Sequence, residues 1–240
     1  MNASRPSSLR NGADVTSRDI PEATVARLPQ YLRALATVVD SGAGTVSSEE
    51  LAAIADVSSA KLRKDLSYLG SYGTRGVGYN CQVLADEIAG ALGVAHDWNV
   101  IIVGLGRLGQ ALAGFSGLKA RGLQVVALVD NDPGVIGTPG PGSSGLTVEP
   151  LDRLADVIAE RDVAIAVIAT PGGSAQPVCD ALVSAGIRSI LNFAPVSLQV
   201  PADVVLRHVD LAGELQILAF HEQRRAADRA ARLDSLERAR

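Results

Sequence analysis

Near the start of the chain, apolar residues recur at the three- and four-residue spacing of helices, and three helices are predicted. The first begins near Pro21, and Pro29 either kinks it or starts it again, because proline has no N–H to donate within a helix. Ser47 heads the S-x-x-E pattern of a capping box at the second helix, and Ser58 or Ser59 caps the third. The predicted buried positions are Val25, Leu28, Leu32, Leu35 and Val39 in the first helix, Leu51, Ile54 and Ala55 in the second, and Leu62, Leu66 and Leu69 in the third.

A glycine-rich segment follows, in which Gly70, Gly73, Gly76 and Gly78 predict a hairpin. Helix, helix, turn, helix and hairpin is the order of a winged helix-turn-helix, which binds DNA. The exposed face of the third helix fits a major groove, and the hairpin fits a narrow minor groove. An ordinary solvated helix and loop is the alternative. The predicted DNA-facing residues are Ser59, Ala60, Arg63, Lys64 and Ser67 on the helix and Arg75 on the hairpin.

From about residue 98, short apolar runs alternate with helical segments. Such runs predict parallel strands buried on both faces, and their alternation with helices predicts a doubly wound α/β fold. The predicted division is a flexible tail over 1–20, a winged-helix domain over 21–80, a connecting helix over 81–97, a Rossmann domain over 98–210, and a final helix and tail over 211–240. The predicted strands cover 100–103, 125–129, 163–169, 190–193 and 204–209, with helices over 108–121, 151–160 and 175–185.

A glycine pattern directly follows the first of these strands and opens a helix. Gly104 permits the tight turn, Gly106 lets the backbone approach a pyrophosphate, and Gly109 allows close packing of helix on strand. Asp130 ends the second strand, where a carboxylate binds both ribose hydroxyls and repels a 2′-phosphate. NAD(H) is therefore expected rather than NADP(H), and a glycine turn without a ligand is the alternative. The predicted binding residues are Gly104, Leu105, Gly106, Arg107, Leu108, Gly109 and Asp130.

Two loops follow the fourth and fifth predicted strands, at the edge of the sheet where the nicotinamide half of a dinucleotide lies. The second loop is apolar, and a dry pocket without an anion disfavours the charged ring of NAD⁺. A preference for NADH is therefore our hypothesis. The predicted binding residues are Thr170 and Pro171 in the first loop and Asn192, Phe193, Ala194 and Pro195 in the second.

Composition narrows the class of protein. The chain has 240 residues, 47% hydrophobic and 20% charged, which excludes a disordered protein. Its net charge of −4 argues against nucleic-acid binding by the chain as a whole, but Lys61, Arg63, Lys64 and Arg75 form a positive patch that suits phosphates. Two cysteines cannot form a four-thiolate site, and no metal is predicted. With no signal peptide or long apolar run, the sequence predicts a cytoplasmic protein without a membrane partner.

An NAD-dependent oxidoreductase with an accessory helix-turn-helix is the alternative function. Hydride transfer needs a positioned acid or base, often His or Lys, beside the nicotinamide. His96 precedes the first strand, His208 lies within the last, and His221 is on the final helix. The three lysines fall on the third helix and the first Rossmann helix. No catalytic residue is therefore predicted, and a regulator is favoured over an enzyme.

Five motifs occur together in the chain: Tyr31-Leu32-Arg33, Arg63-Lys64-Asp65-Leu66-Ser67-Tyr68, Gly73–Tyr79, Gly104–Gly109 and Asn192–Val196. In this combination, residues 20–222 resemble the Rex family of bacterial redox-sensing transcriptional repressors. The resemblance implies a homodimer with swapped C-terminal helices that binds a palindromic operator and is released by NADH, with NAD⁺ as a competing ligand. This is a population shift between two dimer states. The predicted DNA-binding set becomes Ser58, Ser59, Lys61, Arg63, Lys64, Ser67, Tyr68, Arg75, Gly76 and Tyr79.

The resemblance also implies a ligand-controlled switch. Arg33 of the first helix and Asp210 at the end of the last strand are the expected partners in an ion pair between domains. Phe115 stands where family members often have tyrosine, so the hydrogen bond of that hydroxyl is missing here. The apolar first half of the final helix needs a partner surface, which the swapped dimer would supply.

Overall fold

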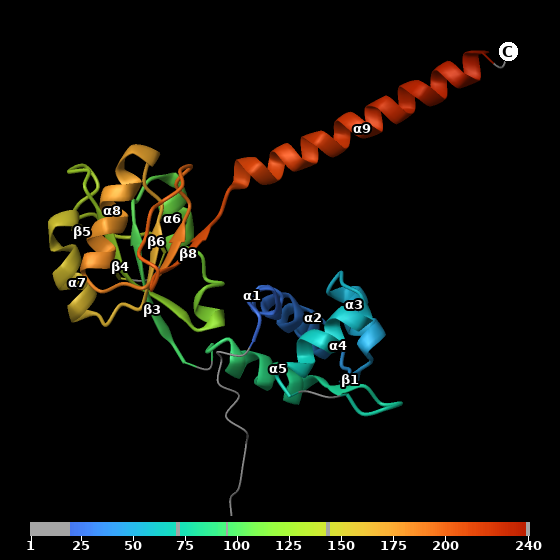
Figure 1. Ribbon diagram of the computed structural model, residues 1–240. Helices are drawn as coiled ribbons and strands as arrows, with labels where there is room; N and C mark the ends of the chain where they lie inside the picture. The colour runs from blue at the N-terminus through green and yellow to red at the C-terminus, as the bar shows by residue number, and fades with distance from the viewer. Residues whose placement is uncertain (1–19, 71–72, 95, 143–144, 239–240) are drawn as a thin grey trace, which may run out of the picture. The chain divides into compact units, whose positions relative to one another are not determined.

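The computed structural model describes residues 20–70, 73–94, 96–142 and 145–238, with side chains described as far as Arg229. The chain divides into two compact units, Met1–His96 and Asp97–Arg240, which are considered separately (Figure 1). The tail predicted over 1–20 lies outside the described residues except for Ile20, which is buried. The winged-helix and Rossmann predictions are both confirmed, as the elements of the two units show.

The N-terminal unit is a small helical domain with a two-stranded wing. Thr45–Val46 and Tyr79–Asn80 pair antiparallel, and a bridge between Thr74 and Gly78 forms the predicted hairpin. The backbone N–H groups of Glu50 and Lys61 donate to the Ser47 and Ser58 hydroxyls, so these serines cap the second and third predicted helices. The elements are α1 (Glu22–Val25), α2 (Leu28–Asp40), β1 (Thr45–Val46), α3 (Ser48–Ile54), α4 (Ser59–Ser67), β2 (Tyr79–Asn80) and α5 (Cys81–Ala91).

In this unit the structure decides one alternative that the sequence left open and differs from the sequence prediction in two details. Pro29 lies in the first turn of α2, so it starts the helix again after α1 instead of kinking one long helix. Val39 and Ile54 were predicted to be buried but are each 43% exposed, because Val38 and Ala52 take the inward positions. The segment 81–97 was predicted as a separate connector, but α5 packs against α2 and belongs to this unit. Its core residues are Cys81, Leu84 and Ile88.

The C-terminal unit is built on a six-stranded parallel sheet in the order β5-β4-β3-β6-β7-β8, which is the Rossmann order. Alternate side chains of its strands enter two separate apolar clusters, as expected for a sheet covered on both faces. The strand β5 was not predicted, and α6 ends eight residues earlier than expected. The elements are β3 (Trp98–Val103), α6 (Arg107–Ala113), β4 (Leu123–Asp130), β5 (Val148–Pro150), α7 (Leu154–Glu160), β6 (Ile165–Ile168), α8 (Gly172–Ser184), β7 (Ser189–Asn192) and β8 (Val205–His208), with 3₁₀ turns at Lys119–Arg121 and Leu151–Arg153.

A single long helix, α9 (Leu211–Arg238), ends the described chain (Figure 1). Its apolar side chains are more than half exposed in the single chain, which leaves a large apolar surface uncovered. No helix among the described residues combines the length and hydropathy needed to span a membrane. The exposed apolar residues of α9 are Leu211, Leu215, Ile217, Leu218 and Phe220.

Candidate functional site

A cavity of about 570 Å³ lies at the carboxyl ends of the central strands of the C-terminal unit. It joins segments that are distant in sequence: the glycine loop after β3, the end of β4, the turn after β5, the loop after β6 with the start of α8, and the loop after β7. This edge of a doubly wound sheet is where dinucleotides bind. The lining includes Gly104, Gly106, Arg107, Leu108, Asp130, Thr170, Pro171 and Phe193 from the predicted set.

Each of the three glycines of the loop is needed for a different structural reason, or is not needed by the fold at all. Gly104 has a φ of +97°, and a side chain there would press against the backbone of Ala169. A Cβ on Gly109 would overlap the carbonyl oxygen of Gly104, so α6 can approach β3 only through a glycine. A Cβ on Gly106 would meet nothing within 4 Å, so the fold does not require this glycine. The open space beside Gly106 is where a pyrophosphate would lie against the backbone.

Asp130 is anchored by the backbone around it. Its Oδ2 accepts from the Leu105 N–H at 2.5 Å, and its Oδ1 accepts from the N–H groups of Asn131 and Asp132 at 2.7 and 2.9 Å. Three of its roughly four acceptor positions are therefore used, and one remains for a ribose hydroxyl. The Leu105 side chain is buried and its N–H is taken, so Leu105 shapes the loop and has no N–H to offer a phosphate.

The loops after β6 and β7 contribute unequally to the lining of the cavity. The Thr170 hydroxyl oxygen is buried without a hydrogen-bond partner among the described residues, although it belongs to a residue that lines the cavity. An unpaired buried hydroxyl is costly, so it fits a site that a polar ligand completes. Of the four residues predicted at the end of β7 and in the loop that follows it, only Phe193 lines the cavity.

Asn192 holds the shape of that second loop. Its side chain is fully buried. The amide nitrogen donates to the carbonyl oxygens of Ala194 and Val196 and lies 3.1 Å from His208 Nδ1. The amide oxygen accepts from the Ala194 N–H. Ala194 is buried and Pro195 is exposed outside the cavity lining. The prediction of nucleotide contact by Asn192 and Ala194 side chains is therefore not supported, because both are enclosed by protein.

The predicted DNA face of the N-terminal unit is largely exposed. The side chains of α4 and the wing border a groove of about 570 Å³, which α3 closes on its other side with Ser47, Ser48 and Glu49. Arg63 Nη1 donates to Ser48 Oγ and Glu49 Oε1 at 3.0 and 3.1 Å. The carboxylate of Glu49, which was not part of the predicted DNA face, therefore lies beside the Arg63 guanidinium. The exposed residues of the predicted set are Ser58, Lys61, Arg63, Lys64, Ser67, Arg75 and Gly76, and the half-buried ones are Ser59 and Tyr68.

Tyr79 differs from the rest of that set. It is only 8% exposed, and its ring packs in the core of the unit against Gly73. Burial raises the pKa of its hydroxyl above the ordinary tyrosine value. Tyr79 also lines the groove beside α4 and the wing, so its ring supports the wing while its contact with DNA remains a prediction.

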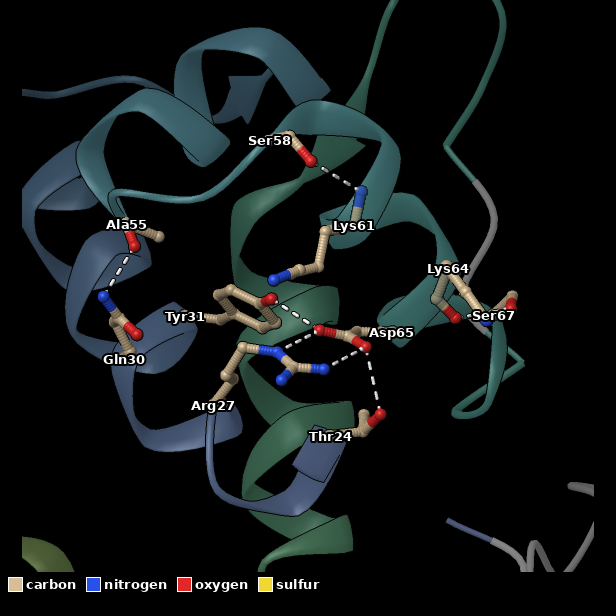
Figure 2. Close-up of polar contacts among 10 residues, drawn as sticks. All are labelled: Thr24, Arg27, Gln30, Tyr31, Ala55, Ser58, Lys61, Lys64, Asp65 and Ser67. Atoms are coloured by element: carbon tan, nitrogen blue, oxygen red, sulfur yellow. Dashed lines mark hydrogen bonds and ion pairs between the residues drawn. The ribbon is translucent and has the colours of Figure 1, made fainter. Parts of the chain in front are cut away.

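A buried cluster surrounds Asp65, as Figure 2 shows, and no sequence pattern indicates it. Asp65 lies on α4 and is 2% exposed. Arg27 donates to both carboxylate oxygens at 2.6 and 2.8 Å, and the hydroxyls of Tyr31 and Thr24 donate at 2.7 and 3.0 Å. Burial alone would raise the pKa of Asp65, but these hydrogen bonds and the charge of Arg27 hold it below the ordinary value. Burial and the Asp65 contact raise the pKa of Tyr31 to about 12.

Comparison with known proteins adds to this geometry. Residues 19–67 match a family model described as "Putative DNA-binding protein N-terminus", and residues 95–196 match one described as "CoA binding domain". The redox-sensing transcriptional repressor Rex of Streptomyces coelicolor is 59% identical over 215 residues, which are 90% of this chain and 82% of the relative. The Rex repressor of Desulfitobacterium hafniense is 46% identical over 87% of this chain and 98% of its own length.

The chain belongs to the Rex family. Among solved structures, a Rex-family repressor called RSP superposes with TM-scores of 0.81 in its complex with NAD⁺ and operator DNA and 0.78 in its complex with NADH. It is 30% identical and covers 89% and 88% of this chain, respectively. The similarity therefore extends over both the winged-helix unit and the Rossmann unit.

The residues expected to form the Rex switch lie in different units. Arg33 is exposed on α2, whereas Asp210 accepts from the Gly213 N–H and caps α9. Phe115 follows α6, is 53% exposed, and borders a smaller cavity of about 330 Å³. The Arg33–Asp210 pair remains a prediction. In the part of the chain that the structure describes, no group of three or more His, Cys, Asp and Glu side chains could hold a metal.

Replacing Gly106 by valine is expected to weaken NADH binding by about tenfold or more while leaving the fold intact. The added side chain would fill the space left for the pyrophosphate, and Gly106 has an ordinary φ of −63°. Fluorescence titration with NADH measures the affinity, and the thermal melt of Trp98, which belongs to the same unit, checks the fold. Wild-type affinity in the valine variant would contradict the placement of the ligand.

Asp65→Asn is expected to destabilise the N-terminal unit by about 3 kcal/mol at neutral pH, because Arg27 loses its charge partner. Since the folded-state pKa of Asp65 is lowered, its contribution is present above the ordinary value of 3.8 and is lost as pH falls through the lower folded-state value. The gap between wild type and variant should therefore shrink at acid pH. All four tyrosines lie in this unit, so tyrosine near-ultraviolet circular dichroism follows its unfolding. A gap that stays constant down to pH 2 would contradict this role.

Proposed function

We propose that this Rex-family chain is a DNA-binding transcriptional repressor that senses the NADH/NAD⁺ ratio and leaves its operator when NADH binds. The observation that carries the proposal is that one chain holds a winged-helix DNA face and a dinucleotide cavity in two separate compact units. Rex relatives are named as redox-sensing repressors, and RSP has been solved both with NADH and with NAD⁺ and operator DNA.

Each group that lines the cavity binds a different part of the dinucleotide in this proposal. The backbone beside Gly106 and the start of α6 receive the pyrophosphate, Asp130 receives the ribose, and Thr170 supplies an unused hydroxyl. Phe193 presents an apolar surface to the nicotinamide half, which favours the uncharged ring of NADH. NAD⁺ binds the same residues and competes, but its charged ring gains less from that surface.

On the DNA side, α4 enters a major groove and the wing reaches an adjacent minor groove. Arg63 and Lys64 are exposed on the outer face of α4, and Arg75 is exposed between two glycines of the wing. These three basic side chains reach the edges of nucleobases or the phosphates. The rest of the surface is formed by Ser58, Ser59, Lys61, Ser67, Tyr68 and Gly76. We propose that operator DNA displaces Glu49 from Arg63, because a phosphate or a guanine competes for the same guanidinium.

The working form is a homodimer, with α9 as the swapped element. The apolar residues of α9 are exposed in the single chain, and a contiguous apolar surface of this kind is typical of an interface. A two-fold dimer presents two reading units to a palindromic operator. Arg33 and Asp210 form the ligand-dependent pair of the switch, in which Phe115 takes the place of a hydrogen-bonding tyrosine. We place the protein in the cytoplasm, where the operator and the nucleotide pool are found.

Because the Rex relatives are named as transcriptional repressors, we infer that the chain is a regulator and not an enzyme. The described residues that line the nucleotide cavity include no His, Lys, Cys or Tyr that could act as a catalytic acid or base, and Asp130 is held by backbone N–H groups. The alternative, an NAD-dependent oxidoreductase with an accessory helix-turn-helix, predicts oxidation of NADH in the presence of a small carbonyl substrate. The repressor predicts no such turnover.

Operator retention during nucleotide titration is the direct test of the proposed function. A palindromic duplex selected by the protein from a random pool is labelled, bound, and titrated separately with NADH and NAD⁺. We expect release at a much lower concentration of NADH than of NAD⁺, because only NADH favours the unbound dimer state. The Gly106→Val variant serves as the control that should stay bound. Equal release by both nucleotides, or by neither, would contradict redox sensing.

A further inference from the structure

The helix that carries the predicted DNA-reading residues also carries a buried charge. Asp65 is the one charged residue among the described residues that is buried, and it follows Arg63 and Lys64 directly in α4. It lies between Leu62 and Leu66 on the inner face of the helix, which are both fully buried. A carboxylate at this core position needs an explanation, because burial of an ion is costly unless it is paired and hydrogen-bonded.

We propose that Asp65 is a positioning residue for DNA recognition: its carboxylate fixes the orientation of α4 against α1 and α2, and thereby sets which bases Arg63 and Lys64 reach. The inference rests on the proposed DNA-binding function and adds a determinant of its specificity. Asp65 itself touches no DNA. It acts through the helix that it holds.

The geometry supports orientation because the contacts come from three directions. Arg27, which precedes α2, binds both carboxylate oxygens, Tyr31 of α2 donates to Oδ2, and Thr24 of α1 donates to Oδ1 (Figure 2). A guanidinium bound to both oxygens fixes a plane as well as a distance. Leucine contacts alone are non-directional and would allow α4 to turn about its axis.

The magnitude of such a turn shows why orientation matters. A helix with its side chains is about 10–12 Å across, so a rotation of about 20° moves a side-chain tip by about 2 Å. Hydrogen bonds to base edges tolerate only a few tenths of an ångström around 2.9 Å. A small rotation of α4 therefore removes base readout while leaving its positive charge near the phosphates, which supports non-specific binding.

Stability alone does not account for the cluster. Buried ion pairs can often be replaced by apolar residues at little cost or even with a gain in stability, whereas loss of one partner is destabilising. The cluster also joins α4 to the helix that carries the predicted switch residue Arg33, two positions after Tyr31. Movement imposed on α2 would thus carry α4 with it as part of one rigid unit.

The test replaces the pair without changing the net charge. In the double variant Arg27→Met, Asp65→Leu, two apolar side chains replace the ion pair and the summed charge stays the same, while the Tyr31 and Thr24 hydroxyls lose their acceptor. Affinity is measured for the selected palindromic duplex and for a scrambled duplex of equal length, at one salt concentration and at a temperature where circular dichroism shows full folding. We expect unchanged affinity for the scrambled duplex and at least a tenfold loss of preference for the palindrome.

Two further variants make the result decisive. Arg27→Lys keeps the positive charge, but a lysine cannot bind both carboxylate oxygens in one plane. We therefore expect this variant to lose part of the preference for the palindrome. It also provides the test if the double variant does not fold. Gln30→Met removes a 2.6 Å hydrogen bond from α2 to the Ala55 carbonyl, outside α4, and should keep wild-type preference. Folded cluster variants with wild-type preference would overturn the inference. Failure of the wild-type protein to select any sequence would instead overturn the proposed function.

Discussion

The nucleotide site depends on the close approach of α6 to the end of β3. The Gly104 carbonyl oxygen occupies the space that a side chain at position 109 would need, and Gly104 itself turns with a φ that L-residues rarely adopt. This packing brings the Leu105 N–H to Asp130 and thereby ties the glycine loop to β4. With the loop held by the fold, Gly106 is left facing open space, and the cavity is shaped before any ligand arrives.

The DNA-reading unit uses a different physical device for the same purpose of preorganisation. Its core is apolar, but the orientation of α4 is fixed by a charged cluster whose donors come from α1 and α2. Directional bonds define one arrangement of helices where apolar packing alone allows several. Under the proposed function, NADH binding in the other unit would move this unit as one body. In the proposed dimer, the exposed apolar surface of α9 is the contact between the two chains.

Much of the fold can be predicted from local patterns in the sequence. The caps of α3 and α4, the hairpin, the apolar strands and the glycine fingerprint each depend on residues a few positions apart, so the sequence predicts them correctly. Asp65 could not be placed in this way, because in the sequence it is one acid within a basic helix and its partner Arg27 lies in another element. Asn192 was assigned to the ligand for the same reason: it lies at the carboxyl end of β7 as expected, but its side chain contacts Val196 and His208, which the local sequence does not reveal. The short strand β5 has too few residues to form a pattern, and the amphipathic α5 looks the same whether it connects domains or packs in a core.

The central claim is that NADH in the Rossmann unit changes the separation of the two DNA-reading units in the dimer. Both native cysteines are buried, so a spin label on Ala53→Cys, at an exposed position of α3 outside the predicted DNA-binding set, reports that separation selectively. The distance between the two labels should be measured by pulsed electron resonance with NAD⁺ and operator, and again with NADH. We predict a spacing compatible with grooves about 34–36 Å apart in the first state and a clearly different distance in the second. Identical distance distributions in the two states would contradict the account.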